Sequence, residues 1–289
     1  MSQDPQSQGN RLDPWFDAYA DRAHNLRASE IRALFSVVSR PEVVSLAGGM
    51  PNLKDLPLES LAETAKELIL SSGAQALQYG SGQGWEPLRE QLVNVMTYDG
   101  IIGADPDDVV ITTGSQQALD LMAELFIDSG DVVLAESPSY VGALGCFRAR
   151  QADVIHVDMD DNGIIPEALE ETIRRLKSAG RAIKFLYTIP NFQNPAGVTL
   201  SLERRPLIAE ICMREHVLIL EDNPYGLLGF DSDPLPALHS WSPEGVVYLG
   251  SVSKMFAPGM RIGWALAPHA IRAKLILASE AAILSPGMF

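Results

Sequence analysis

The chain has 289 residues, of which 46% are hydrophobic and 20% charged, an ordinary globular balance with material for one large domain. Its formal net charge of -15, from 37 acidic and 22 basic residues, argues against nucleic acid and anionic membranes as partners, because such a surface repels phosphate groups. No apolar run approaches the roughly 20 residues of a membrane helix, and the polar start lacks the pattern of a signal peptide.

The cysteines and histidines predict neither disulfides nor a metal site. Cys146 and Cys212 lie in segments with helical patterns and share no motif, which indicates free thiols in a reducing compartment. The five histidines are scattered, and no pair has the spacing of metal ligands. A cytoplasmic protein is therefore expected.

The first part of the chain is predicted to lie apart from the main domain. Residues 1–12 are polar and predicted to form a disordered tail. Residues 13–57 form an N-terminal segment, with a helical pattern from Trp15 to about Leu34 and a glycine-containing loop at Val43–Pro51. Residues 58–289 are predicted to form the large domain. Its first two helices are expected at about Leu58–Ser71 and Glu86–Tyr98.

From Val109 onwards, short β-branched runs alternate with amphipathic helical patterns. Strands that are apolar on both faces and joined by helices predict a three-layer α/β/α fold with a mostly parallel seven-stranded sheet. The last two strands are joined by only 11 residues without a helical pattern, which allows one of them to run antiparallel. The strands are predicted at Val109–Thr113, Val132–Ala135, Val154–Val157, Ile183–Tyr187, Val217–Leu220, Val246–Gly250 and Ile262–Ala267. The helices are predicted at Gln116–Phe126, Tyr140–Arg150, Pro166–Ser178, Leu202–Arg214 and about Ala270–Ile283.

Polar residues follow several of these strands, at the edge where ligands bind in open α/β sheets. Gly114, Ser115 and Gln116 open a helix after the first strand, where free backbone N–H groups favour an anion; an ordinary serine N-cap explains the same residues. Tyr140 follows the second strand. It is suited to stack on a planar ligand, but equally to a place in the core or on the surface.

Two further strand ends carry amide and acidic groups. Asn194 lies in a rigid loop and precedes a proline, which excludes helical dihedrals and holds the amide in one orientation; turn chemistry alone also explains the pair. Glu221 and Asp222 end an apolar strand, and a buried carboxylate needs a cationic partner such as a protonated pyridine nitrogen. The alternative is that one acid faces solvent while the other caps the next turn.

The end of the sixth strand gives the strongest signal. Lys254 stands among small hydroxylated residues, seven positions before Arg261. Schiff-base chemistry needs a partly neutral amine, and a lysine lodged against a cofactor and near positive charge is the expected type. Ser251, Ser253 and Arg261 are then available as donors to a phosphate.

The segment Ser251-x-Ser253-Lys254, followed by Arg261, resembles the pyridoxal-phosphate attachment motif of class I/II aminotransferases of fold type I. The strand-end residues upstream occur in the order of that family, and the resemblance runs from about Ser45 to Phe289. The phrases at 45–51 and 77–80 are similar to the subgroup of 2-aminoadipate and broad aromatic or branched-chain aminotransferases.

The resemblance implies a role for each matching residue. Lys254 would form the internal aldimine with pyridoxal 5'-phosphate and then shuttle the substrate proton in a ping-pong exchange between an amino acid and a 2-oxo acid. Asp222 would pair with the pyridinium nitrogen, Asn194 and Tyr225 would bind the phenolic oxygen, and Tyr140 would stack on the ring. The residues implied for the phosphate are Ser115, Gln116, Ser251, Ser253 and Arg261.

The same resemblance implies a homodimer with composite sites. Tyr79 stands where the family has a tyrosine that reaches the phosphate of the partner subunit, and Gly49 would lie near the substrate. In the family, a C-terminal segment completes the small domain and carries the arginine for the substrate carboxylate. This sequence ends before that segment, so an incomplete small domain is expected and cofactor binding is implied more directly than turnover.

Two alternatives share these residues. Another pyridoxal-phosphate reaction, such as β-elimination or decarboxylation, uses the same scaffold, because a fold does not fix a reaction. The effector-binding domain of a transcription regulator would bind the cofactor without catalysis. It would need a basic winged-helix module upstream, for which residues 1–45 are too short and too acidic.

Overall fold

The computed structural model describes residues 15–24, 26, 40, 42–44 and 49–289. Its centre is a seven-stranded sheet in the order β1-β9-β8-β7-β6-β2-β3, in which β9 is antiparallel to both neighbours and the other pairs are parallel. The strands of this sheet are β1 (Val109–Thr112), β2 (Val132–Glu136), β3 (Asp153–Val157), β6 (Ile183–Thr188), β7 (Leu218–Asp222), β8 (Val246–Ser251) and β9 (Gly263–Leu266). The helices are α1 (Asp21–His24), α3 (Leu58–Ala76), α4 (Glu86–Met96), α5 (Ser115–Phe126), α6 (Val141–Ala149), α7 (Pro166–Ser178), α8 (Arg204–Arg214), α9 (Val252–Met255) and α10 (His269–Ile283).

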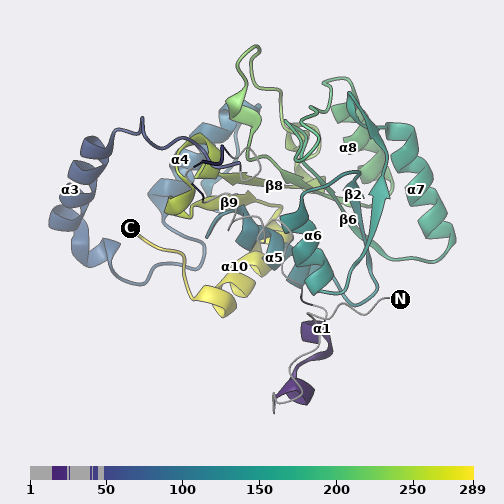
Figure 1. Cartoon of the computed structure of the whole chain (residues 1–289), viewed down its shortest axis with the longest axis horizontal. Coiled ribbons are helices and arrows are strands. Elements are labelled where there is room, and N and C mark those ends of the chain that lie inside the picture. Colours follow the sequence, from purple (N-terminus) through teal and green to yellow (C-terminus); the bar gives the residue numbers. More distant parts are fainter. Residues whose placement is uncertain (1–14, 25, 27–39, 41, 45–48) are drawn as a thin grey trace.

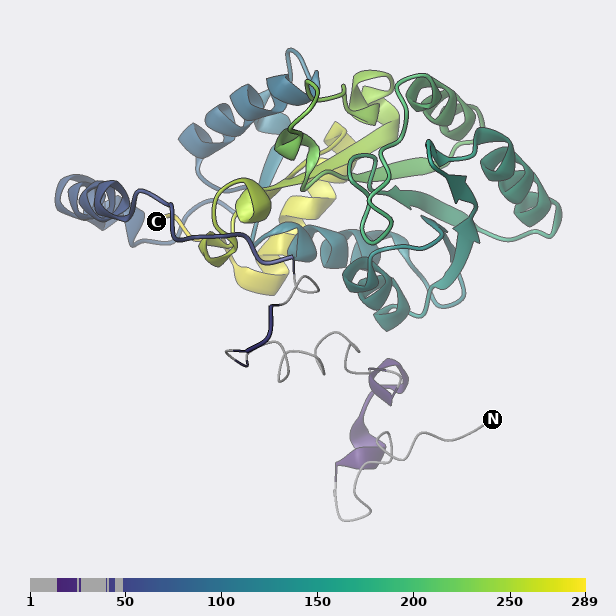
Figure 2. The same ribbon diagram turned by 45° about the horizontal axis from the view of Figure 1, so that its top comes forward.

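Helices cover both faces of the sheet (Figures 1 and 2). Helices α5, α6 and α10 bury their apolar side chains against one face, in a core that includes Phe147, Phe185 and Leu220. Helices α7 and α8 pack on the other face around Leu134 and Ile219, and α4 extends that layer over β1 and β9. The predicted three-layer α/β/α fold and its mostly parallel sheet are confirmed, including the antiparallel strand after the short connection.

Side-chain alternation along each strand decides which polar group faces which layer. In β7, Leu220 belongs to the core under α5 and α6, whereas Ile219 belongs to the core under α7 and α8. Asp222 therefore continues the first face and Glu221 the second. Glu221 accepts hydrogen bonds from the backbone N–H groups of Leu238 and His239, at 2.8 and 3.0 Å, and so caps a 3-10 turn.

The N-terminal segment departs from its prediction. A continuous helix from Trp15 is wrong in the described part, because a 3-10 turn (Phe16–Ala18) and α1 are separated by extended backbone at Tyr19. Neither piece buries a residue, and a short helix without tertiary packing is marginal in water. The predicted tail at residues 1–12 and the rest of the predicted helix lie outside the described residues.

Several short elements were not predicted, among them those in two connections. The connection between β8 and β9 contains α9 and a 3-10 turn (Pro258–Met260), although its sequence shows no helical period. A two-stranded hairpin, β4 (Met159–Asp160) with β5 (Gly163–Ile164), precedes α7. Such short pieces carry too few residues for a periodic pattern.

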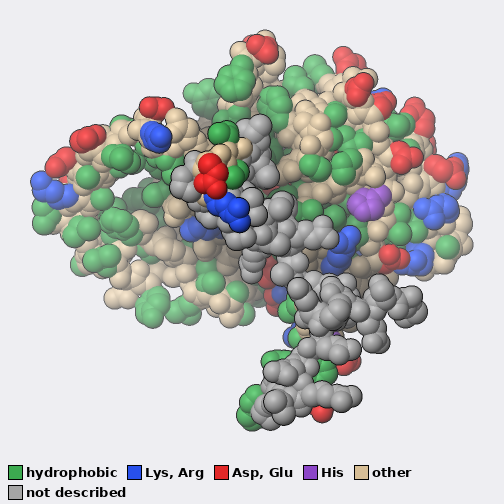
Figure 3. Space-filling view, in the orientation of Figure 1, with side chains coloured by type: hydrophobic (Ala, Val, Ile, Leu, Met, Phe, Trp, Pro, Cys, Tyr) green, Lys and Arg blue, Asp and Glu red, His purple; other side chains and the backbone are tan. Residues whose placement is uncertain are grey.

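Helix α3 stands at one end of the molecule, away from the sheet (Figure 1). Only Ala76 of its 19 residues is buried, and apolar side chains lie exposed along it in the space-filling view (Figure 3). Leu70 is 78% exposed and Leu77, just after the helix, 70%. Among the described residues, no helix is both long and apolar enough to cross a membrane.

Candidate active site

A cavity of about 720 Å³ opens at the carboxyl ends of the central strands. Its lining comes from the segments that follow β1, β2, β6, β7 and β8, so it lies where ligands bind in open α/β sheets. It brings together all but one of the predicted site residues, namely Gly49, Ser115, Gln116, Tyr140, Asn194, Asp222, Tyr225, Ser251, Ser253, Lys254 and Arg261.

Lys254 enters this cavity from α9, directly after the end of β8. Ser251 caps the short helix by accepting a hydrogen bond from the backbone N–H of Ser253 at 3.0 Å. The Lys254 amine donates to the carbonyl oxygen of Gly49 at 2.8 Å. Burial lowers the pKa of Lys254, which favours the neutral amine that a nucleophile requires.

Asp222 presents a buried carboxylate with one oxygen left over. Its Oδ2 accepts a hydrogen bond from the phenol of Tyr187 at 2.9 Å, while Oδ1 is buried and has no hydrogen-bond partner in the described part of the chain. Burial raises the pKa of Asp222 to about 6, against the opposing effect of the Tyr187 hydrogen bond. A buried acceptor without a donor is costly unless a ligand supplies one. A protonated ring nitrogen fits this oxygen, so the residues present suit the predicted pyridoxal phosphate.

An aromatic side chain and two polar groups line the cavity beside Asp222. Tyr140 is half-buried there, and a Cβ at Gly142 would overlap its ring, so the glycine leaves room for the ring's position. The Asn194 amide donates to the Tyr225 hydroxyl at 3.3 Å. These groups provide a flat apolar surface and a pair of hydrogen-bonding side chains in one cavity.

The opposite end of the site has the features of an anion-binding turn. Helix α5 begins at Ser115, so the N–H groups of its first turn lack partners within the helix. The Arg261 guanidinium crosses Gly114 and donates to the carbonyl oxygen of Thr113 at 2.8 Å. A Cβ at Gly114 would overlap that guanidinium, and one at Gly263 would lie 2.6 Å from the Ser115 nitrogen. The lack of a side chain at Gly114 thus makes room for the Arg261 guanidinium. The lack of one at Gly263 makes room for the backbone at the start of α5.

Gln116 lines the cavity, but its side chain is already engaged. The amide nitrogen donates to the carbonyl oxygen of Gly142 at 3.2 Å and to the Cys146 sulfur at 3.0 Å. Any anion contact of Gln116 would therefore come from its backbone N–H rather than its side chain.

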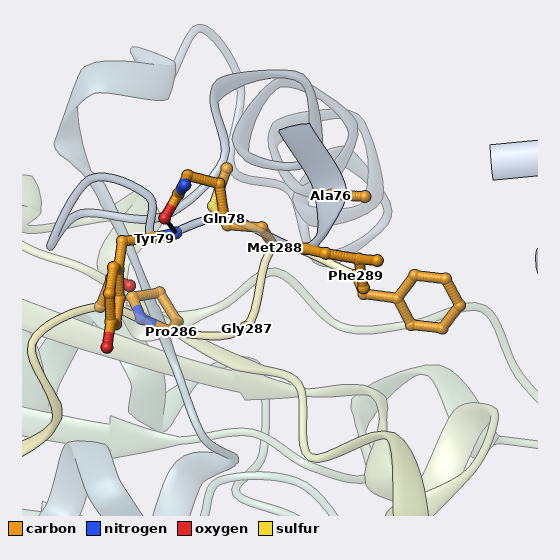
Figure 4. Close-up of a pocket in the computed structure, with 9 residues that line it drawn as sticks. Ala76, Gln78, Tyr79, Pro286, Gly287, Met288 and Phe289 are labelled. Atoms are coloured by element: carbon orange, nitrogen blue, oxygen red, sulfur yellow. Dashed lines mark hydrogen bonds between the residues drawn. The ribbon is translucent and has the colours of Figure 1, made fainter. Parts of the chain in front are cut away.

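Tyr79 lies apart from this cavity. It is 76% exposed and lines a second hollow of about 530 Å³, shared with the segment Ser285–Phe289 (Figure 4). Tyr79 therefore does not line the cavity that contains Lys254 of its own chain.

Three residues of the site were not predicted individually. Tyr187, Glu136 and Gln193 are buried, and each hydrogen-bonds within or beside the cavity wall. Strand alternation would have found Tyr187, which lies on the same face as Asp222. Glu136 and Gln193 needed knowledge of which loops meet in space.

The comparisons with known proteins agree with this architecture. The family model described as aminotransferase class I and II matches residues 41–288. Aromatic-amino-acid aminotransferase 1 of Thermococcus litoralis is 41% identical over 94% of this chain and 65% of its own length. The 2-aminoadipate transaminase of Thermus thermophilus is 38% identical over 95% and 67%.

A solved structure gives the same result. The crystal structure of Pyrococcus horikoshii kynurenine aminotransferase in complex with PMP has a TM-score of 0.89 and 38% sequence identity. The alignment covers 97% of this chain and 69% of that one. The present chain thus spans about two thirds of the length of these relatives. Because the family model matches 248 of its 289 residues, the chain belongs to the family of class I and II aminotransferases.

Proposed function

We propose that this chain binds pyridoxal 5'-phosphate at Lys254 and acts as an aminotransferase, moving an amino group between an amino acid and a 2-oxo acid by a ping-pong mechanism. The observation that carries the proposal is the buried Oδ1 of Asp222, which has no partner among the described residues and belongs to a residue that lines the same cavity as Lys254. The solved relative in complex with PMP adds support, as do relatives whose names describe amino-group transfer.

Bound pyridoxal phosphate would supply an electron sink for the charge that develops when an amino acid loses its α-proton. Asp222 would hold the proton of the ring nitrogen through Oδ1, while Tyr187 fixes the other oxygen. A charge-assisted hydrogen bond in such a dry site is worth about 1.5–3 kcal/mol.

Lys254 would bind the cofactor covalently and then carry the substrate proton. Its amine needs a neutral form to attack and to accept a proton, and burial shifts its pKa in that direction. The amine donates to the Gly49 carbonyl, and Gly49 would lie near the substrate.

The remaining residues would orient the cofactor. Tyr140 would stack on the ring, and Asn194 with Tyr225 would donate to its phenolic oxygen. The phosphate would lie at the start of α5, held by Ser115, the backbone of Gln116, Ser251, Ser253 and Arg261.

The further parts of the proposal concern assembly and location. A homodimer would bring Tyr79 to the phosphate of the partner, and the exposed apolar residues along α3 support such an interface. Residues 58–289 would form the large domain, with 13–57 as the N-terminal arm and part of the small domain. The buried free thiols Cys146 and Cys212 support the cytoplasm as the compartment.

Absorbance spectroscopy tests the proposal. Protein mixed with pyridoxal phosphate should gain a visible band, and borohydride should fix the cofactor to the chain. Lys254→Ala should remain colourless, whereas Lys274→Ala, at an exposed lysine of α10, should behave as wild type.

Substrates then identify the reaction. Single amino acids should bleach the band, and 2-oxoglutarate should restore it. A well-folded wild-type protein without the band would refute the cofactor. A band that amino acids bleach and 2-oxo acids never restore would exclude transamination and favour a lyase reaction.

A further inference from the structure

Glu136, the last residue of β2, is a buried carboxylate for which the proposed chemistry has no use. It is 2% exposed and accepts three hydrogen bonds, from the Thr188 hydroxyl at 2.6 Å, the Gln193 amide at 2.9 Å and the backbone N–H of Ile189 at 3.2 Å. All three donors lie at the end of β6 or in the loop that follows it. Glu136 thus binds β2 to that loop at the rim of the cavity.

Gln193 extends the connection into the loop itself. Its side-chain nitrogen also donates to the Pro138 carbonyl at 2.8 Å, and its side-chain oxygen accepts from the backbone N–H of Ala196 at 2.9 Å. Its own backbone N–H donates to the Val198 carbonyl at 2.8 Å. These bonds close a tight turn whose second residue is Asn194.

Asn194 is the only residue of that turn to which the proposed function gives a role toward the cofactor. Its amide reaches Tyr225 across the cavity at 3.3 Å, and the turn determines where the amide points. The path from Glu136 to Asn194 is continuous: Gln193 donates to Glu136, hydrogen bonds of Gln193 close the turn, and Asn194 follows Gln193 directly in the chain.

We propose that Glu136 and Gln193 form a positioning pair, which fixes the turn so that Asn194 donates to the phenolic oxygen of the bound cofactor. This inference rests on the proposed function and names residues that act through another residue. A carboxylate suits the task because its two oxygens accept several donors at once. Burial of this carboxylate costs stability, as the rise of the pKa of Glu136 to about 7 shows. Packing alone therefore does not account for a glutamate at this position.

Two substitutions break the pair at different ends. Glu136→Leu removes all three acceptor contacts, and Gln193→Leu removes the side-chain bonds inside the turn. Glu136→Gln is the conservative variant, because its amide oxygen can face Ile189 and Gln193 while its nitrogen donates to the Thr188 hydroxyl. Glu221→Leu is the matched control, a glutamate buried near the end of β7, two strands from β2 and on the same face of the sheet, bonded to residues 238 and 239.

The first readout is the pH titration of the visible absorbance of cofactor-loaded protein. Donors to the phenolic oxygen favour its anion, so loss of the Asn194 contact should raise the titration midpoint. We expect rises of about 0.5 pH unit or more for Glu136→Leu and Gln193→Leu, with the midpoint unchanged in Glu136→Gln and Glu221→Leu. In an Asn194→Ala background, Glu136→Leu should add no further shift.

The second readout is amide hydrogen exchange of the cofactor-free protein, which is independent of pyridoxal phosphate. Residues 189–197 should exchange faster in Glu136→Leu and Gln193→Leu than in Glu221→Leu. A midpoint that stays at the wild-type value in Gln193→Leu, or a shift that persists without Asn194, would overturn the positioning role while leaving the proposed function intact. A wild-type protein that binds no pyridoxal phosphate would instead overturn the function, and faster exchange would then support only the hydrogen-bonded turn.

Discussion

The cofactor-free protein should become more stable as the pH falls from about 8 to about 5.5. Burial raises the pKa of Glu136 and of Glu221 to about 7 and that of Asp222 to about 6. Between the unfolded and folded pKa values, the folded chain keeps a proton that the unfolded chain has released. Stability therefore decreases as pH rises through that window, the reverse of the behaviour of an ion-paired carboxylate.

The size of the effect follows from these pKa values. Across this pH range each glutamate contributes about 2 kcal/mol to the free energy of unfolding and Asp222 somewhat less than 1 kcal/mol. His239 opposes them by somewhat more than about 1 kcal/mol, because burial lowers its pKa to about 4 and only the unfolded chain gains its proton near pH 5.5. The net expectation is about 3 kcal/mol greater stability at the lower pH.

Urea unfolding at several pH values, followed by circular dichroism, measures the effect. Glu221→Gln should reduce the difference between the two pH values by about 2 kcal/mol, whatever it does to stability at either one. Asp160→Asn is the matched control. The pKa of Asp160 is lowered to about 2 by its exposed pair with Arg204, so its stabilisation is lost only below this window. A wild-type protein that loses stability on acidification to pH 5.5, or an unchanged difference in Glu221→Gln, would refute the reasoning.

Three further predictions concern the cavity. Asp222→Ala should weaken pyridoxal-phosphate binding by about 10- to 100-fold, measured by fluorescence titration, since it removes a charge-assisted hydrogen bond; unchanged affinity would contradict the pairing with the ring nitrogen. Gly114→Ala should destabilise the protein by about 1–3 kcal/mol in urea unfolding, because the residue has φ +74° and its Cβ would overlap Arg261, and a neutral result would argue against that geometry. Mixed chains of Lys254→Ala and Tyr79→Ala should regain cofactor affinity that neither has alone, whereas no recovery in a proven mixed dimer would count against Tyr79 as a residue of the partner's site.

Much of the fold could be predicted from the sequence because the patterns that indicate its strands and helices are local. The continuous apolar strands and the amphipathic helices each span enough residues to show a period, and all seven strands of the sheet lie within one or two residues of their predicted bounds. The 11-residue connection allowed an antiparallel strand, because a parallel crossover usually needs a dozen or more residues, and β9 does run antiparallel. The helix from Trp15 failed because a helical pattern does not form a helix without a surface to pack on.

The residues of the candidate site that lie at the end of their own strands could be predicted from the sequence. Lys254 and the acid pair at the end of β7 needed only the rule that ligands bind beyond the carboxyl edge, and the family resemblance then implied Asp222 as the acid for the ring nitrogen. The role of Glu136 could not be predicted because it depends on β6 lying beside β2, and these two strands are separated in the chain by α6, β3, the β4–β5 hairpin and α7. The sequence pattern does not show that β6 is the neighbour of β2.

The contrast between the two acids of β7 shows what structure adds to pattern. Glu221 and Asp222 are adjacent, both buried and of the same charge, so the residue pattern apart from the family resemblance left open which one meets a ligand. Because successive side chains of a strand point to opposite faces of the sheet, the two acids lie on opposite faces. The residues that pack on each face then determine which hydrogen bonds each acid makes. Glu221 accepts hydrogen bonds from two backbone N–H groups, whereas Asp222 accepts one from a phenol and its other oxygen has no partner in the described part of the chain. Asp222 is therefore the acid to which a ligand can supply the missing hydrogen-bond donor. Glu136, on the face of Glu221 and fully bonded, is by the same reasoning a residue that holds others in place.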